Sequence, residues 1–183
     1  MNTNIPTEIQ EIAKNIYRTI RQENPITDTI TLLHIADEYT LIAQGTDDKK
    51  PEKLWLLDIG TEKTAHEFFK HNPPTPGEVE NAITVVEDEV MPLHKLLEPS
   101  STLYSFDSSI YKIALQTIST EQKNETILSR SDMEQIFDRL AAIISGRPAS
   151  TDILPTENSF AATLLILREV MHHLGFKEII IKP

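Results

Sequence analysis

The pattern of apolar and polar positions predicts an amphipathic helix at the start of the chain, followed by three strands. In the helix, apolar side chains recur at intervals of three and four from Ile9 to Ile20, which is the spacing of one helix face. Only Asp37 and Glu38 separate the first two strands, so we expect a hairpin with an acidic tip. The third strand should extend it into an antiparallel meander. The segments are residues 7–23, 30–36, 39–44 and 53–59.

The third strand ends at Gly60, where the apolar spacing changes from that of a strand to that of a short helix ending in Phe68-Phe69. A proline-rich break follows. A second helix should begin at Pro76, because Thr75 can act as its N-cap and Glu78 can complete a capping box.

The second half of the chain predicts two more strands among further helices. Pro92 should kink or divide the helix that begins at Pro76, residues 119–129 should be a polar loop, and Ser131 with Glu134 should cap a later helix. The remaining segments are a strand at 102–106, a helix from 108, an almost wholly apolar helix at 160–174 and a closing strand at 178–181. This order indicates a single α/β domain with a layered sheet.

Composition narrows the class of protein. The chain has 183 residues, no cysteine and a formal net charge of −11. An acidic excess repels nucleic acid and anionic membranes, and the absence of cysteine fits a reducing compartment. The first residues show no signal-peptide pattern. We therefore expect a cytoplasmic protein with no nucleic-acid or membrane partner.

Two groups of residues carry a resemblance to a known family. The first is the strand ending at Gly60 with the short helix and the Pro-Pro-Thr-Pro break that follow; the second is Asp152-Ile153-Leu154-Pro155 with the apolar helix and last strand after it. In this order they resemble the second lobe of the exopolyphosphatase/guanosine pentaphosphate phosphatase (Ppx/GppA) family. The resemblance implies a ribonuclease H-like, actin-like ATPase fold with a mixed five-stranded sheet flanked by helices. It implies one domain over 1–183, with an N-terminal helix at 1–25 and the lobe at 26–183.

The phosphate-binding motif of that family departs from its pattern in this sequence. The family has an Asp-Ile-Gly-Gly-Gly-Ser-Thr-Glu hairpin tip, whereas residues 34–41 read His-Ile-Ala-Asp-Glu-Tyr-Thr-Leu. A second glycine-rich loop corresponds to Phe106-Asp107-Ser108-Ser109, and the loop after Pro155 also lacks glycine. The family's general-base glutamate belongs to a first lobe that this chain does not contain. The resemblance therefore implies a retained fold and a lost reaction.

Two hypotheses of function remain open. The first is a non-catalytic interaction or regulatory module without cofactor or catalytic residues, which binds a protein partner or forms a homodimer with Trp55 or the 9–20 helix near the contact. The second is a divergent phosphohydrolase, or a sensor of polyphosphate or guanosine polyphosphates, that closes its cleft with a second chain. Mg²⁺ and a phosphorylated metabolite belong only to the second hypothesis. Its candidate ligand-binding residues are Thr40, Gly60, Thr64, Ser108, Ser109 and Arg147.

The histidines and acidic runs do not predict a metal site. His66 and His71 are five residues apart, and a helical zinc pair needs a spacing of four. His172 and His173 close a helix, where they are expected to cap its C-terminus. The run of Glu87, Asp88 and Glu89 fans around a helix and is expected to be a solvated face.

Overall fold

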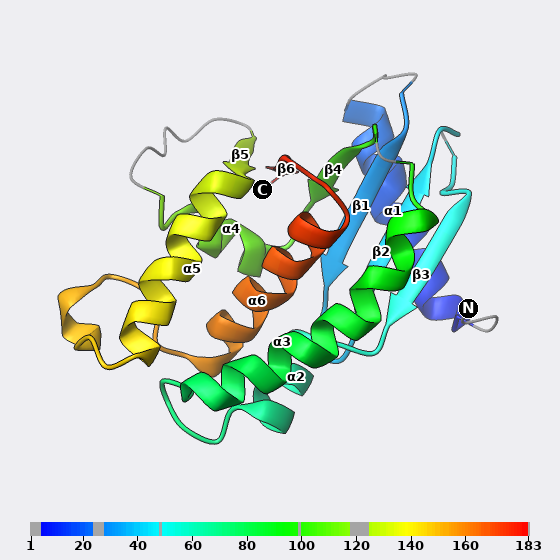
Figure 1. Cartoon of the computed structure of the whole chain (residues 1–183). Coiled ribbons are helices and arrows are strands. Elements are labelled where there is room, and N and C mark those ends of the chain that lie inside the picture. Colours follow the sequence, from blue (N-terminus) through cyan, green and yellow to red (C-terminus); the bar gives the residue numbers. More distant parts are fainter. Residues whose placement is uncertain (1–4, 24–27, 48, 99, 118–124, 183) are drawn as a thin grey trace.

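The computed structural model describes residues 5–23, 28–47, 49–98, 100–117 and 125–182. Within these residues, no helix has both the length and the apolar character needed to cross a membrane. The chain forms one mixed sheet with helices on both of its faces (Figure 1).

The sheet has six strands in the order β3-β2-β1-β4-β6-β5. The predicted meander is confirmed, because β1–β2 and β2–β3 are antiparallel, while β1, β4 and β6 run parallel to one another. The β1–β2 register pairs Ile35 with Thr40 at the tip of the hairpin. The strands are β1 (Ile30–Ile35), β2 (Thr40–Gly45), β3 (Lys53–Leu57), β4 (Thr102–Ser105), β5 (Thr126–Ser129) and β6 (Glu178–Ile181).

The expectation of five strands was wrong by one. β5 lies within the predicted polar loop and pairs antiparallel with β6, Leu128 opposite Ile179. Leu128 is fully buried, whereas Ile127 is 55% exposed, so the strand has one buried apolar side chain and its sequence pattern is weak. The preceding part of that loop, residues 118–124, lies outside the described residues.

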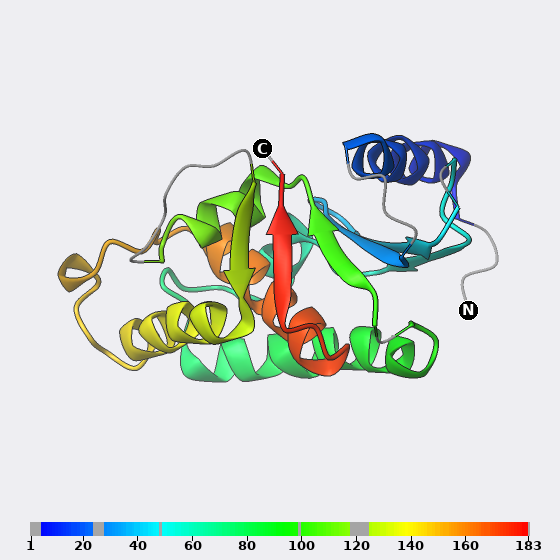
Figure 2. The ribbon, with the colours of Figure 1, turned by 90° about the horizontal axis from the view of Figure 1, so that it is seen from above.

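The helices divide unequally between the two faces of the sheet. Figure 2 shows α1 alone on one face, with α3, α5 and α6 on the other. The helices are α1 (Thr7–Glu23), α2 (Thr61–Phe68), α3 (Pro76–Val90), α4 (Ser108–Ala114), α5 (Arg130–Ile144) and α6 (Asn158–His173), with short 3-10 turns η1 (Met91–Lys95) and η2 (Ala149–Thr151).

Each face has its own apolar core. The small core beneath α1 includes Ala13, Tyr17 and Ile20 against Leu32 and Leu41. The large core lies on the other face and centres on α6, in which eleven of the sixteen residues are buried, as the almost wholly apolar sequence of this helix predicts.

The helix boundaries test three sequence predictions. The capping box of Thr75 and Glu78 is confirmed, and α3 gives way to η1 just before Pro92, as the proline predicts. The box assigned to Ser131 and Glu134 was wrong. The N-cap of α5 is Ser129, whose hydroxyl accepts from the Asp132 amide. The helix begins there because β5 ends at Ser129 and no loop separates the strand from α5.

Candidate functional site

The candidate site lies where β1 and β4 end, at the tip of the β1–β2 hairpin. Ligands of open α/β sheets bind outside the carboxyl ends of parallel strands, and β1 and β4 are adjacent and parallel. The tip consists of residues 36–39, with Asp37 and Glu38 both exposed. A hydrogen bond of 2.9 Å from the Ala36 amide to the Tyr39 carbonyl closes it.

The N-terminus of α2 packs against this tip through backbone hydrogen bonds. The Thr61 amide donates to the Ala36 carbonyl at 2.9 Å, and the amides of Glu62 and Lys63 donate to the Asp37 carbonyl at 3.0 Å. The first amides of a helix are the groups that hold an anion at a helix N-terminus. In this protein those amides are already bonded to the hairpin.

Gly60 makes this contact possible because it has no side chain. A Cβ atom at Gly60 would lie 2.4 Å from the Asp37 carbonyl oxygen and 2.5 Å from the Glu38 carbonyl carbon, far inside van der Waals contact. The backbone φ of Gly60 is −145°, so the glycine is needed for the close approach of two backbone segments.

His34 and Asp107 join the ends of β1 and β4. The imidazole Nδ1 lies 2.5 Å from Asp107 Oδ1, and the Ile35 amide donates to Asp107 Oδ2 at 2.6 Å. The Asp107 side chain is 8% exposed and that of His34 is 23% exposed. The hydrogen bond to Asp107 raises the pKa of His34 above its ordinary value, against an opposing effect of burial. The Ile35 amide therefore already donates its hydrogen bond to a carboxylate of the protein.

The cation in the first turn of α2 is also paired with a carboxylate. Lys63 in α2 forms an ion pair of 2.6 Å with Asp58, and this contact raises the pKa of the Lys63 ammonium. The two exposed carboxylates of the tip thus lie beside amides of β1 and α2 that already have oxygen partners.

Thr40, Gly60 and Thr64 lie together beneath the tip. The Thr40 hydroxyl donates to the Ile59 carbonyl at 2.8 Å, and the Thr64 amide donates to the Gly60 carbonyl at 2.9 Å. The Thr64 hydroxyl is buried and has no hydrogen-bond partner among the described residues. Ser108 and Ser109 open α4, directly after Asp107, so Asp107 connects them to the hairpin.

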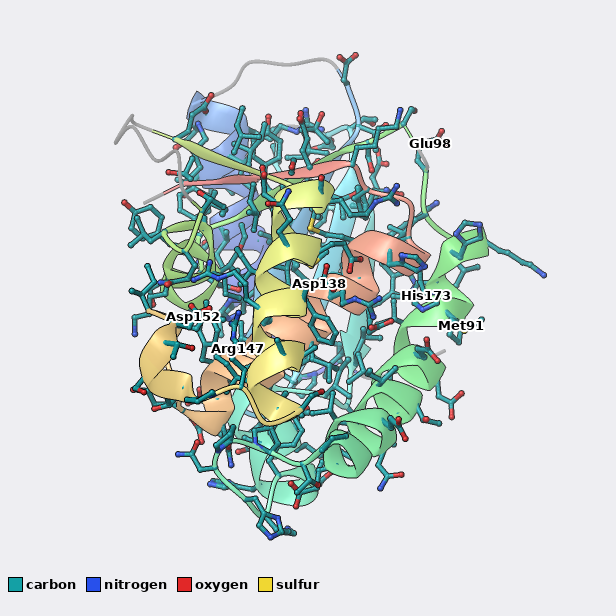
Figure 3. The ribbon with its side chains drawn as sticks, turned by 60° about the vertical axis from the view of Figure 1, so that its left-hand side comes forward. Met91, Glu98, Asp138, Arg147, Asp152 and His173 are labelled. Carbon is teal, nitrogen blue, oxygen red and sulfur yellow. The ribbon has the colours of Figure 1, made fainter. Side chains whose placement is uncertain are left out.

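Arg147 belongs to a different part of the molecule. Its guanidinium bonds to Asp152 at 2.5 Å and to the Arg139 carbonyl at 3.0 Å, and Figure 3 shows Arg147 and Asp152 near one another beside α5. The hydrogen bond from Arg139 is the main cause that lowers the pKa of Asp152 to about 2. Within the described part of the chain, no hydrogen bond or ion pair joins Arg147 to the other five candidate residues.

Sequence reasoning missed the residues that close the site. In the sequence, Asp107 stands out only as part of a loop that lacks the family's glycines. An aspartate directly before a predicted helix is a capping signal, but its partner His34, 73 residues away, leaves no local sequence signature. The Thr61 hydroxyl meets the Thr163 hydroxyl at 3.0 Å, and both residues are buried. That contact fastens α2 to α6 and holds the short helix against the tip.

The expectation for His173 was also wrong. Its imidazole lies between Glu87 of α3 and Glu169 of α6, at 3.2 Å and 3.0 Å, instead of capping the end of its own helix. Glu87 is correspondingly part of a contact between helices and not of a solvated face. His66 and His71 are both exposed and contact different carboxylates. His66 lies 3.7 Å from Glu62, and His71 lies 2.9 Å from Glu78.

Comparison with solved structures supports the same fold. The chain superposes on the Aquifex aeolicus PPX-GPPA enzyme with a TM-score of 0.77 and 18% identity, covering 95% of this chain and 60% of the enzyme. An exopolyphosphatase from Cytophaga hutchinsonii gives 0.69 and 14%, covering 94% and 59%, and an exopolyphosphatase-like protein gives 0.73 and 12%, covering 97% and 63%. The chain thus spans about three fifths of the length of these proteins.

No curated protein matches the sequence. The family model does: the model of the Ppx/GppA phosphatase family matches residues 37–183, which is most of the chain and includes Asp37 and Glu38 of the hairpin tip, Gly60 and Asp107. The sheet and helices agree with that family's actin-like fold. This chain belongs to the Ppx/GppA phosphatase family.

Proposed function

We propose that this protein is a non-catalytic member of the Ppx/GppA family that acts as an interaction or regulatory module. One observation carries the proposal. Four backbone amides next to the hairpin tip, those of Ile35, Thr61, Glu62 and Lys63, donate to oxygen atoms of the protein itself. A phosphoryl group would have to break these bonds before it could be held there.

The charges around the tip oppose an anion as well. Asp37 and Glu38 are exposed at the tip, and the Asp107 carboxylate lies behind it. Two like charges 4 Å apart repel by about 4 kcal/mol at an effective dielectric constant of 20. A polyphosphate chain carries a charge on every unit, so the repulsion between its phosphates and the carboxylates of the tip increases with each unit that lies nearby.

Phosphate release by the pure protein tests this proposal. Polyphosphate, guanosine pentaphosphate and ATP are each incubated with the protein and Mg²⁺, beside an active exopolyphosphatase. We expect no release above the rate without protein. Turnover by the wild type that is absent from the Asp107→Asn variant would overturn the proposal, because a contaminating phosphatase would act in both preparations.

One observation favours the second hypothesis, a divergent phosphohydrolase or sensor that completes its cleft with another chain. The Thr64 hydroxyl is buried without a hydrogen-bond partner among the described residues, beside Gly60 and the tip, and such a group is stabilised by a ligand or a water molecule. In this reading the Asp37 and Glu38 carboxylates would hold Mg²⁺, which would supply the positive charge that a phosphorylated metabolite needs. Isothermal titration with polyphosphate or guanosine tetraphosphate separates the hypotheses: a salt-sensitive, Mg²⁺-dependent signal that a Thr64→Val variant loses favours the second.

A further inference from the structure

We propose that Glu87, Glu169 and His173 form a binding site for one divalent transition-metal ion between α3 and α6. The ligand atoms of these three residues lie within 4.8 Å of one another, and His173 Nε2 lies 3.2 Å from Glu87 Oε1 and 3.0 Å from Glu169 Oε2. Ligand atoms about 2.1 Å from a tetrahedral zinc ion are separated by about 3.4 Å. The two separations from His173 thus already match a first coordination shell, and the Glu87 and Glu169 oxygens lie within 4.8 Å of each other.

Glu169 is the anchor of this site. Its side chain is 1% exposed, and Arg168 Nη1 donates to Glu169 Oε1 at 2.6 Å. Arg168 is fixed in turn by Glu134 at 2.9 Å and by stacking over the Phe137 ring. Buried carboxylates that are oriented by a second partner in this way are typical of metal ligands. Arg168 leaves Glu169 Oε2 directed at His173.

The contacts of His173 are those expected if its Nε2 atom and the two carboxylates bind one cation together. A neutral imidazole carries at most one hydrogen on Nε2, yet two carboxylate oxygens lie within hydrogen-bond distance of that atom. One hydrogen cannot point straight at both oxygens, whereas a cation set among the three atoms contacts all of them. The backbone carbonyl of His173 also accepts from His94 Nδ1 at 2.7 Å, which fixes the end of α6 to η1. Figure 3 shows His173 in the space between α6 and α3.

The local charges favour a cation as well. Glu134 and Glu169 contact a single guanidinium, that of Arg168, and Glu87 contacts the imidazole of His173. The three carboxylates and one guanidinium therefore hold more negative than positive charge when His173 is neutral. One nitrogen and two oxygens suit Zn²⁺ and its first-row neighbours better than Mg²⁺ or Ca²⁺, which prefer oxygen alone. Glu87 and His173 are 38% and 20% exposed, so water can complete the coordination. The site needs no part of the hairpin tip and does not depend on the proposed function.

Zinc titration of the protein after treatment with a chelator tests the site. We expect binding of one Zn²⁺ per chain by isothermal titration, and a rise in Tm of about 5–10 °C when free Zn²⁺ is about one hundred times Kd. His173→Ala and Glu87→Gln should each weaken binding at least about tenfold. Both residues are partly exposed, and circular dichroism checks that the variants fold. Co²⁺ should give the absorption of a protein-bound ion in the wild type and lose it in His173→Ala.

The matched control is His172→Ala, which removes the adjacent, exposed imidazole and leaves the three ligands intact; it should bind Zn²⁺ as the wild type does. His94→Ala tests whether the imidazole of η1, which contacts the His173 carbonyl, is itself a metal ligand. This variant should also bind Zn²⁺ as the wild type does. The proposal is overturned if the wild type binds no Zn²⁺ at micromolar concentration, or if His173→Ala binds as tightly as the wild type. In that case the three side chains form only a proton-mediated contact between α3 and α6.

Discussion

At the scale of single residues, Gly60 decides whether the hairpin can close on α2. Two backbone segments meet at this position without room for a Cβ atom. The three helix amides that bond the tip follow directly after Gly60. The change of apolar spacing predicts this glycine from sequence as the end of a strand, and the structure adds the reason why a side chain is excluded.

We expect Gly60→Ala to lower the free energy of unfolding by about 1–3 kcal/mol or more, because the methyl group forces apart two rigid backbone segments. Urea denaturation measures the loss. Gly77→Ala is the matched control: nothing lies within 4 Å of a Cβ atom there, and the residue is in α3, so this change should be neutral or stabilising by up to about 1 kcal/mol. Equal stability of the two variants would contradict the packing described at the tip.

At the scale of elements, the His34–Asp107 contact joins two parallel strands where they end. His34 is the fifth of the six residues of β1, and Asp107 directly precedes α4. The contact thus ties the hairpin to the β4–α4 connection and sets the shape of the candidate site.

This contact predicts a stability that depends on pH. Because the pKa of His34 is raised in the folded protein, its contribution is complete below the unfolded value of about 6.5 and is lost as the pH rises through the folded pKa. The wild type should therefore exceed His34→Gln in unfolding free energy by more at about pH 6 than at about pH 9. Denaturation at both pH values measures this. NMR titration should place the imidazole pKa above 6.5 in the wild type and lower in Asp107→Asn; an unchanged pKa would contradict the pairing.

The sequence predicts the helices and strands better than it predicts the side-chain contacts between them. Long periodic segments such as α1 and α6 were predicted because their apolar spacing repeats over several turns, and Thr75 was a local signal that the structure confirms. β5 was missed because one buried leucine in four residues is too short a pattern. The His34–Asp107 and Glu87–His173 contacts join residues 73 and 86 positions apart. Such contacts depend on the order of strands and helices, which local patterns do not specify.

At the scale of the whole molecule, one edge of the sheet carries an apolar groove. β3 is the edge strand, and its side chains border a cavity of about 580 Å³ against η1. The apolar residues that line the groove are Leu54, Trp55, Leu56, Leu57, Pro92, Leu93 and Leu96, and the charged ones are Lys53 and Glu89. Met91, the first residue of η1, is 52% exposed. The apolar face of α1, by contrast, is buried in the small core. Of the two regions that the sequence offers for a dimer contact, we propose the one at Trp55.

We expect the protein to be a homodimer in which the β3 edges of two copies meet. Edge strands with apolar side chains are templates for pairing with another chain, and contiguous apolar surface is normally covered in a soluble protein. Trp55→Lys places a charge in the lining of the groove and should shift the mass measured by light scattering from dimer to monomer at micromolar concentration. Ile153→Lys is the matched control, because Ile153 is 80% exposed and lies outside the groove; this variant should remain a dimer. A monomeric wild type would leave the groove to a different protein partner, and the role of the module would then be to bind that partner instead of itself.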